Sequence, residues 1–393
     1  MSWLSCVPWL AAALAAPGDD YEAEALFPPE RLHNHGSCVV EYPRGSLFVV
    51  WYRGSGERKA DDVQVMGSRR RIGSKEWAPP FVLADTPGFP DANPCAFVDP
   101  RGKLWLLWPV ILANEWHTAL LQYKVTSDAP EAGVPRWEEE RTLLLRPGPE
   151  FSATIDRLLP DLLASVPPES RARAEGWARE IQSKAREKLW TRLGWMPRVH
   201  PIVLDARRIL VPLYSDGFDM SLIAISDDWG ATWRASAPLV GGGAVQPSLT
   251  VRKDGTIVAH LRDNGLPPHR VLRSESKDRG ETWTMAQDTS LPNPGAGLET
   301  IVLKDGPWVL VNNDTEQGRR SLAVSLSEDE GRTWRSTRHL EPRADFTGDR
   351  SASYPSIIEA SDGRLHVTYS RSTEGETIFH ATFSIAWVRA GDP

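Results

Sequence analysis

One eight-residue pattern occurs three times in the second half of the chain, and it limits the possible folds more than any other feature. The pattern is Ser-x-Asp-x-Gly-x-Thr-Trp, and its copies start at Ser226, Ser276 and Ser327, which are 50 and 51 residues apart. Asp and Gly favour a tight turn, and we expect Thr and Trp to lie in the strand that follows it. A fixed period of about 50 residues is typical of the blades of a β-propeller.

A second repeat gives the number of blades. Six times along the chain, a turn dipeptide precedes a strand of alternating apolar residues, so we expect six blades. The turns are Arg44-Gly45, Arg101-Gly102, Ala206-Arg207, Asp254-Gly255, Asp305-Gly306 and Asp362-Gly363. The sequence therefore predicts an all-β fold, a six-bladed β-propeller that spans residues 26–390.

The interval between the second and third turns is about twice as long as the others. The excess carries apolar residues at helical spacing over residues 155–163 and 171–193, and Pro167-Pro168 separates the two stretches. We therefore predict a helical insertion over residues 150–196, within the propeller and between blades 2 and 3. It would serve either as a solvated buttress or as a wall or lid over a site.

Composition excludes several classes of protein. Of 393 residues, 41% are hydrophobic and 25% are charged, which is the balance of a folded globular chain. The formal net charge of -7 disfavours a nucleic-acid partner bound through overall charge. Three cysteines exclude a disulfide scaffold and a Cys-rich metal site. Cys38 and Cys95 each lie in an apolar run, so we expect two buried free thiols.

The N-terminus predicts an exported protein. Residues 3–16 are almost wholly apolar, and Ala13-Leu14-Ala15 fits a small-x-small cleavage pattern, so residues 1–20 read as a secretory signal peptide or a disordered start. A short buried helix is the alternative. We expect a secreted or periplasmic location and no membrane span, because no later stretch is long and apolar enough. The oligomeric state is not predicted.

The inner strand of each blade starts beside the central channel of a propeller. The residues at those starts are His35, Asn93, His200, Gln246, Glu299 and Tyr354. Polar and aromatic side chains that converge on one axis favour a ligand pocket, although a water-filled channel would also satisfy them. Loops after the second strands, with Trp116, His117 and Arg262 among their residues, are charged or aromatic and suit a carbohydrate acid.

These repeats and the six-blade count resemble the bacterial sialidase (neuraminidase) superfamily, most of all its BNR-repeat exo-α-sialidase branch. The resemblance covers Leu26 to the C-terminus outside the helical insertion. In that family the repeats are called Asp-boxes and lie on outer hairpins, so they indicate the fold and not the activity. The resemblance implies a glycoside hydrolase that removes a terminal acidic sugar, such as sialic acid, from glycans without a cofactor.

The family holds the substrate carboxylate with arginines, which bind it bidentately. By position, Arg262 matches the second of these arginines and Arg319 the third, with Arg320 as a neighbour that could take its place. Tyr354 matches the nucleophilic tyrosine, which avoids the repulsion between two carboxylates. The remaining inner-strand and loop residues named above, His35, Asn93, His200, Gln246, Trp116 and His117, are the further substrate-binding candidates.

The acid and base assignments are less direct. The family's general acid is an aspartate on a first-blade loop, where this chain has Asp61 and Asp62, and Asp62 is preferred. The glutamate that activates the tyrosine is expected at position 244, where alanine stands, so Glu299 on the neighbouring inner strand is the candidate base. The family's first arginine and its glutamate partner are also absent. His33–Ser37 and Ser370 occupy their places, which favours a related acidic sugar or a sugar without a carboxylate.

Two other functions fit the same residues. A lyase on uronates would use Tyr354 or a histidine to abstract the proton beside the carboxylate, and a glycan-binding propeller would do no chemistry at all. His33, His35, His117 and His200 match no short metal motif, so no metal site is predicted. Fold analogy alone does not separate these functions.

Overall fold

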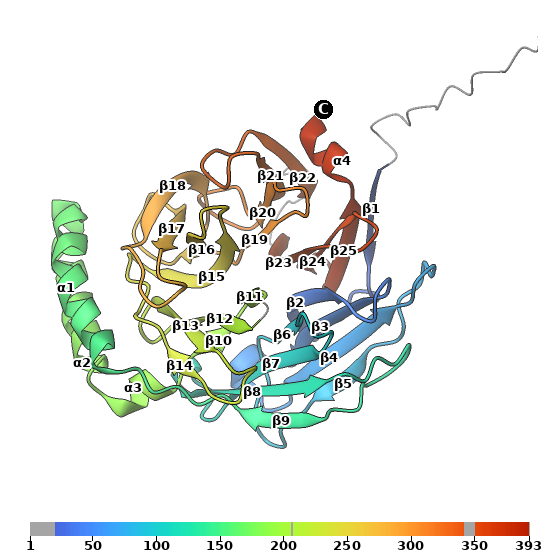
Figure 1. The fold of residues 1–393 in the computed structure, drawn as a ribbon, viewed down its shortest axis with the longest axis horizontal. Helices are drawn as coiled ribbons and strands as arrows, with labels where there is room; N and C mark the ends of the chain where they lie inside the picture. Colours follow the sequence, from blue (N-terminus) through green and yellow to red (C-terminus); the bar gives the residue numbers. More distant parts are fainter. Residues whose placement is uncertain (1–19, 206, 342–349, 393) are drawn as a thin grey trace, which may run out of the picture.

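The computed structural model describes residues 20–205, 207–341 and 350–392. Six antiparallel sheets surround a central axis and form the ring seen in Figure 1. The predicted six-bladed β-propeller is therefore confirmed. Of the six predicted turns, only Ala206-Arg207 includes a residue outside the described part.

The first three blades follow one another along the chain. Blade 1 contains β2 (His33–Glu41), β3 (Leu47–Gly54), β4 (Gln64–Arg70) and β5 (Phe81–Ala84). Blade 2 contains β6 (Cys95–Val98), β7 (Leu104–Ile111), β8 (Ala119–Thr126) and β9 (Glu139–Thr142). Blade 3 contains β10 (Met196–Pro197), β11 (Ile202–Leu204), β12 (Arg208–Ser215), β13 (Met220–Ser226) and β14 (Arg234–Ala235).

The last three blades complete the ring. Blade 4 contains β15 (Ala244–Val251), β16 (Ile257–Asp263), β17 (Arg270–Ser276) and β18 (Gln287–Pro292). Blade 5 contains β19 (Glu299–Val302), β20 (Trp308–Asn312), β21 (Leu322–Ser327) and β22 (Ser336–Glu341). Blade 6 contains β23 (Ser351–Glu359), β24 (Leu365–Ser372) and β25 (Glu376–Phe383), with β1 (Tyr21–Ala25) as its outer strand.

Strand β1 closes the ring, because it comes from the N-terminal end of the chain and pairs antiparallel with β25 of the last blade. Tyr21 stacks on Trp387 of α4 (Ile385–Ala390) with ring centroids 4.8 Å apart. The propeller therefore begins at Tyr21 and not at Leu26 as predicted. The sequence signal is weak because β1 has only five residues and none of them is buried.

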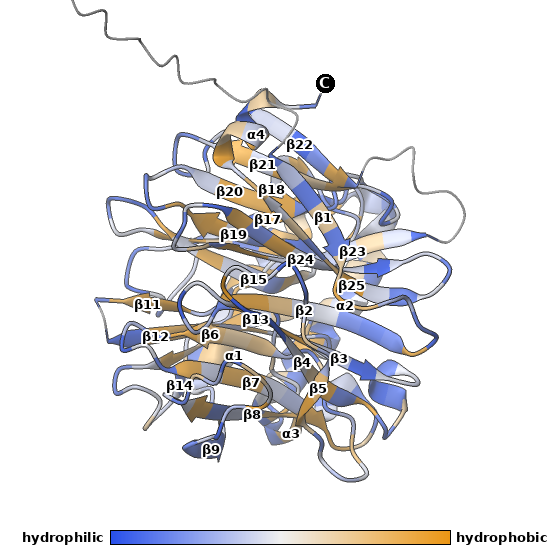
Figure 2. Cartoon of the chain, turned by 90° about the vertical axis from the view of Figure 1, so that its right-hand side faces the viewer, coloured by the Kyte–Doolittle hydropathy of each residue, from blue (hydrophilic) through white to orange (hydrophobic). Residues whose placement is uncertain are grey.

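Apolar side chains fill the spaces between neighbouring blades, and in Figure 2 the hydrophobic stretches follow the strands while the connecting loops are hydrophilic. Second strands such as β7 and β20 are buried along their whole length. Burial of this kind contributes about 25 cal/mol per Å² of apolar surface and holds the blades in a fixed ring.

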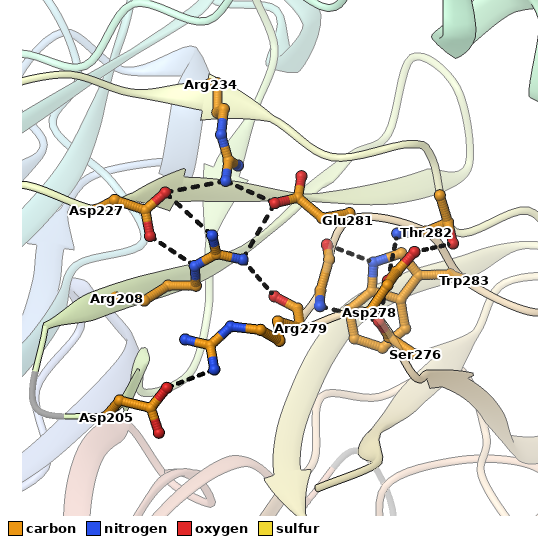
Figure 3. Close-up of polar contacts among 11 residues, drawn as sticks. Asp205, Arg208, Asp227, Arg234, Ser276, Asp278, Arg279, Glu281, Thr282 and Trp283 are labelled. Atoms are coloured by element: carbon orange, nitrogen blue, oxygen red, sulfur yellow. Dashed lines mark hydrogen bonds and ion pairs between the residues drawn. The ribbon is translucent and has the colours of Figure 1, made fainter.

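The three eight-residue repeats form turns of the same design, and Figure 3 shows the second one. Asp278 accepts hydrogen bonds from Ser276 Oγ at 2.8 Å and from Thr282 N at 2.9 Å. Gly280 has a positive φ of 90°, and a Cβ there would lie 3.1 Å from the Leu210 side chain. The Thr and Trp lie within the turn and not in the following strand as predicted, because the aspartate holds the Thr backbone and hydroxyl.

The second repeat also joins blade 4 to blade 3 (Figure 3). Arg208 on β12 pairs with Asp227 of its own blade at 2.6 Å and with Glu281 of the next blade at 3.1 Å. Arg234 contacts the same two carboxylates at 3.0 and 2.6 Å. A network of charges shared by two blades resists their separation better than an isolated surface pair.

Removal of the turn aspartate is expected to weaken the ring. The change Asp278→Ala should lower the free energy of unfolding in urea by about 1–2 kcal/mol, since three donors lose a charged acceptor. Burial raises the pKa of Asp278, but its hydrogen bonds lower the pKa by a larger amount. The pKa of Asp278 therefore lies below the ordinary carboxyl value. The contribution is therefore present above the ordinary carboxyl pKa and is lost as the pH falls through the lowered value. Lys277→Ala is the control, and an equal loss in both variants would contradict this role.

The helical insertion lies after blade 2, as predicted, and comprises α1 (Pro149–Ser165), α2 (Arg171–Lys184) and α3 (Lys188–Arg192). It packs on the outer side of blades 2 and 3 (Figure 1). Phe151 meets the rings of Trp195 and Phe218 at 5.9 and 5.5 Å. In the described part of the chain, no helix has the length and apolar character to cross a bilayer. The predicted signal peptide falls almost wholly on residues outside that part.

Candidate active site

Three inner strands are irregular at the positions of the site residues. Strands β2, β15 and β23 each contain a bulge near one end of the central channel. At those bulges Gly36, Gln246 and Tyr354 have positive φ values of 67°, 52° and 57°. Such backbone is costly for Gln and Tyr, and bulges of this kind re-aim side chains next to functional sites.

Tyr354 is the centre of the resulting cluster. Its side chain is 9% exposed, and its hydroxyl oxygen accepts a hydrogen bond from Arg262 Nη1 at 2.7 Å. Gln246 Nε2 donates to the same oxygen at 3.5 Å. Arg262 lies at the end of β16, and the carboxylate of the adjacent Asp263 instead accepts from two backbone N–H groups. The predicted Tyr354, Arg262 and Gln246 are therefore together.

Three more side chains surround the tyrosine ring. The guanidinium of Arg319 lies 5.1 Å from the ring centroid and that of Arg198 lies 5.0 Å from it. The His35 ring lies 4.3 Å away. Arg319 is half-buried whereas Arg320 is exposed, so Arg319 is the arginine of this pair that faces the site. We call Tyr354, Arg262, Arg319, Arg198, Gln246 and His35 the Tyr354 cluster.

Arg198 was not among the predicted site residues. It is 2% exposed and crosses the channel, where it donates to the carbonyl oxygens of Ser37 in blade 1 and Pro355 in blade 6, both at 3.2 Å. Gly297 leaves room for it, because a Cβ there would lie 3.4 Å from Arg198 Nε and 3.1 Å from Gln246 Oε1. Arg198 stands two residues before His200, at the start of an inner strand. This position in the sequence could have predicted Arg198 as a site residue.

The charges of the cluster favour an ionised phenol. Burial raises the pKa of Tyr354, but the guanidinium groups of Arg262 and Arg319 outweigh that effect and lower the pKa below its ordinary value of 10. Burial and the nearby cations, among them His33 and Arg319, hold the pKa of His35 well below 6.5. His35 is therefore a neutral imidazole at neutral pH.

Three buried polar atoms in the cluster have no hydrogen-bond partner within the described chain. They are Arg262 Nε, Arg198 Nε and Gln246 Oε1. Unsatisfied polar atoms are rare in buried positions, and those that occur call for a bound molecule or water. Two of the three are guanidinium donors, so the cluster suits an anionic ligand.

A second loop brings carboxylates to the cluster. Asp216 follows β12, and its charge acts on Arg262, Tyr214 and Tyr354. Burial raises the pKa of Asp216 to about 6, and Arg262 opposes this effect. Asp216 was not among the predicted site residues.

The helical insertion supports that loop. Lys184 Nζ on α2 donates to the Gly217 carbonyl oxygen at 2.9 Å, and a Cβ on Gly217 would lie 2.7 Å from the Trp190 ring of α3. His117 stacks on the same ring at 4.6 Å. The insertion thus acts as a buttress and also holds one wall of the site. His117 contributes to that wall and not to the Tyr354 cluster.

Other predicted residues lie around or outside the cluster. Asn93 donates to Tyr214 Oη at 3.2 Å, and Trp116 carries the Arg58 guanidinium 5.2 Å from its ring centroid. Asp62 accepts from Ser55 N at 3.0 Å, which lowers its pKa despite some desolvation, and Asp61 accepts from Asn114 Nδ2 at 2.9 Å. An exposed aspartate with a lowered pKa is poorly suited to donate a proton at neutral pH.

Glu299 and His200 lie further along the channel and contact each other. Glu299 Oε1 lies 2.6 Å from His200 Nδ1, and Glu299 Oε2 accepts from Ile357 N at 2.8 Å. Both carboxylate oxygens of Glu299 are therefore occupied away from the Tyr354 hydroxyl. No group of three His, Cys, Asp or Glu residues in the described ranges has the geometry to hold a metal ion.

Sequence comparison decides the family. The profile of the BNR repeat-like domain matches residues 45–158 and 177–367. This chain belongs to the BNR repeat-like family. The interval between the two matched stretches, residues 159–176, falls within the helical insertion.

Individual relatives of this BNR repeat-like protein are sialidases. A Clostridium perfringens sialidase is 31% identical over 175 residues, which cover 39% of this chain and 44% of that protein. The anhydrosialidase of Macrobdella decora is 26% identical over 182 residues, or 42% of this chain and 24% of that protein. The chain thus spans less than half the length of the curated relatives that it matches.

Solved structures share the propeller at low identity. A Dyadobacter fermentans protein of unknown function has a TM-score of 0.69 at 15% identity, over 93% of this chain and all of that one. A leech intramolecular trans-sialidase has a TM-score of 0.68 at 11% identity, over 94% of this chain and 71% of that one. These likenesses concern the fold.

Proposed function

We propose that this protein is a sialidase-like exo-glycosidase that removes a terminal acidic sugar from glycans, with Tyr354 as nucleophile. The observation that carries the proposal is the 2.7 Å hydrogen bond from Arg262 to the Tyr354 hydroxyl, in the middle of three guanidinium groups. Positive charge at this point attracts a substrate carboxylate and stabilises the phenolate that must attack. The sialidase relatives support the same class of substrate.

The reaction follows from the arrangement. Arg262 and Arg319 hold the carboxylate, and Tyr354 Oη forms a bond to the anomeric carbon as the glycosidic C–O bond breaks. Asp216 gives its proton to the leaving oxygen. Water then attacks the anomeric carbon, Asp216 takes a proton from that water, and Tyr354 leaves as a phenolate. A tyrosine avoids the repulsion that an anionic carboxylate nucleophile would meet.

This mechanism needs no separate base for Tyr354. Tyr354 attacks as a phenolate that has given its proton to solvent before the substrate binds, because Arg262 and Arg319 lower the phenol pKa. Glu299 therefore takes no part in the proton transfer, and its predicted role passes to the arginines. The alanine at position 244, where the family has a glutamate, is consistent with a phenol activated by cations.

A screen of aryl sialosides and aryl uronides tests the proposal. Release of the free acidic sugar from one class supports it and names the sugar. An unsaturated product that absorbs ultraviolet light would establish the uronate lyase in its place. Glycan binding without any product would establish the non-catalytic propeller, which the absence of the family's first arginine and its glutamate partner favours.

Asp216→Asn is expected to separate leaving-group protonation from the rest of the reaction. For a sugar leaving group, kcat/KM should fall about 10²–10⁴-fold, the range of general acid catalysis, whereas a nitrophenyl leaving group needs little protonation and should lose under about tenfold. In the wild type, kcat/KM should decline as the pH rises through about 6, because Asp216 loses its proton there.

The matched control for this variant is Asp219→Asn, three residues after Asp216 on the same loop, whose carboxylate accepts a hydrogen bond from Asn264 at 3.3 Å. It should keep the sugar substrate within about tenfold of wild type. Equal losses for both leaving groups in Asp216→Asn would contradict the role of Asp216 as the acid.

A further inference from the structure

A cavity of about 600 Å³ opens at the end of the channel opposite the Tyr354 cluster. The strand register shows the separation: on β15, Val245 pairs with Arg262 beside the cluster, whereas Val251 pairs with Ile257 at the other end. The cavity is lined by residues from the inner strands of four blades, among them the half-buried Val251, Ile301 and Ile358. His200 and Glu299 form part of its lining.

The His200 ring is positioned as an imidazolium. Nδ1 lies 2.6 Å from a Glu299 oxygen and Nε2 lies 2.9 Å from the Val39 carbonyl oxygen. Both neighbours accept hydrogen bonds, so both ring nitrogens should carry protons. Burial lowers the pKa of His200, but the Cys38 and Glu299 charges outweigh burial and raise the pKa well above 6.5.

A thiol stands next to this cation. Cys38 Sγ lies 3.4 Å from His200 Nε2 and accepts from Ala96 N at 3.4 Å. Cys38, His200 and Glu299 thus form a line of thiol, imidazole and carboxylate, the arrangement that activates a nucleophilic cysteine. Burial raises the Cys38 pKa, but contacts with Cys95 and His200 bring the pKa well below 9.

A second thiol completes the group. In its protonated form Cys38 Sγ donates to the Ala96 carbonyl oxygen at 3.3 Å, and Cys95 Sγ donates to the same oxygen at 3.8 Å. Cys95 Sγ also donates to the Val199 carbonyl oxygen at 3.2 Å, and burial raises the pKa of Cys95 well above 9, so Cys95 is a protonated thiol. Both cysteines are free and buried. The two sulfurs are therefore neighbours on the adjacent inner strands β2 and β6.

We propose that Cys38 is a reactive thiolate that reduces hydroperoxides entering through this cavity, with Cys95 as its resolving thiol. The Cys38 sulfur attacks the peroxide oxygen, the O–O bond breaks, and the alkoxide or hydroxide that leaves takes a proton from the His200 imidazolium and departs as alcohol or water. The Cys95 sulfur then attacks the Cys38 sulfenic acid, its S–O bond breaks, water leaves, and a Cys38–Cys95 disulfide remains. The two thiols supply the two electrons that the peroxide takes up. This chemistry is independent of the proposed glycosidase.

Hydrogen peroxide and the full chain with Cys6→Ser test the proposal, since that change leaves only these two cysteines. Peptide mapping without reductant should find the Cys38–Cys95 disulfide. Cys95→Ser should stop the reaction at a Cys38 sulfenic acid that dimedone traps, and Cys38→Ser should leave Cys95 reduced. His200→Gln should slow the reaction at least tenfold, whereas His366→Gln, at a buried histidine of blade 6, should not change it.

Two further variants test the route to the thiol. Ile301→Trp and Ile358→Trp narrow the cavity from two blades and should each slow oxidation several-fold while aryl glycoside hydrolysis is unchanged. The proposal is overturned if the folded protein forms neither product, if His200→Gln reacts at the wild-type rate, or if oxidation is no faster than global unfolding. An unchanged oxidation rate in both folded cavity variants would also overturn it.

Discussion

Tyr354→Phe is expected to lower kcat/KM for the best aryl glycoside by at least about a thousandfold. The variant keeps the ring that contacts His35 and the two guanidinium groups, but it removes the oxygen that accepts from Arg262 at 2.7 Å. Loss of a covalent nucleophile affects the transition state far more than ground-state binding. Steady-state kinetics with direct binding of the free sugar separate the two effects, and binding should change by less than about threefold.

The matched control is Tyr52→Phe. Tyr52 is also a buried tyrosine near His35, but its hydroxyl donates to Glu57 at 3.0 Å and does not contact the Arg262 guanidinium. It should keep activity within about tenfold of wild type. If Tyr354→Phe retained more than about a tenth of wild-type kcat/KM, Tyr354 would not be the nucleophile.

Arg262→Met should be the second most damaging change, with a loss of about 10²–10³-fold in kcat/KM. The substitution removes one donor to the substrate carboxylate and the cation beside the tyrosine hydroxyl. The pKa of Tyr354 should therefore rise, because burial would then act with less opposition. An ultraviolet pH titration at the phenolate band, compared with Tyr354→Phe, measures that rise directly.

An exposed arginine on the same side of the ring provides the control for this variant. Arg320→Met removes the same charge from the overall protein but leaves the Tyr354 cluster intact, and it should keep nearly full activity. Arg319→Met should behave like Arg262→Met, because its guanidinium lies 5.1 Å from the Tyr354 ring. Equal activity of the Arg319 and Arg320 variants would show that long-range charge, and not contact, controls the reaction.

The fold could be predicted because its signals are local and repeated. Each turn aspartate accepts hydrogen bonds from groups within four residues of itself, so the whole pattern lies within eight consecutive residues. The six hairpins and the helical insertion follow from short-range periodicity in the same way. The closing strand β1 could not be found like this, because its partner β25 lies at the other end of the chain.

The site was predictable only in part. Tyr354, Gln246 and His35 are found because every inner strand starts at the axis, which fixes their position from topology alone. Arg198 depends on a crossing of the channel to Ser37 and Pro355, more than 150 residues away in each direction. Asp216 owes its raised pKa to burial, and its neighbour Gly217 is held by Lys184 of the insertion. Such effects depend on packing between distant segments, which spacing does not encode.

Glu299 illustrates the same limit. Its place at the start of an inner strand matches that of Tyr354, but the partners of its carboxylate come from His200 and Ile357 on two other blades. Those partners decide toward which end of the channel the Glu299 side chain lies. The sequence predicts which blade brings Glu299 to the channel, but it does not predict at which level of the channel axis the side chain lies.

Trapping of the covalent intermediate tests the central claim most directly. A fluorinated acidic sugar with a fluoride leaving group should react quickly with the enzyme and then hydrolyse slowly, because fluorine beside the anomeric carbon destabilises the second transition state. Mass spectrometry of the digested protein should place the sugar on the Tyr354 peptide, with no adduct in Tyr354→Phe. An adduct on Asp216, Glu299 or any other residue of an active enzyme would contradict the account.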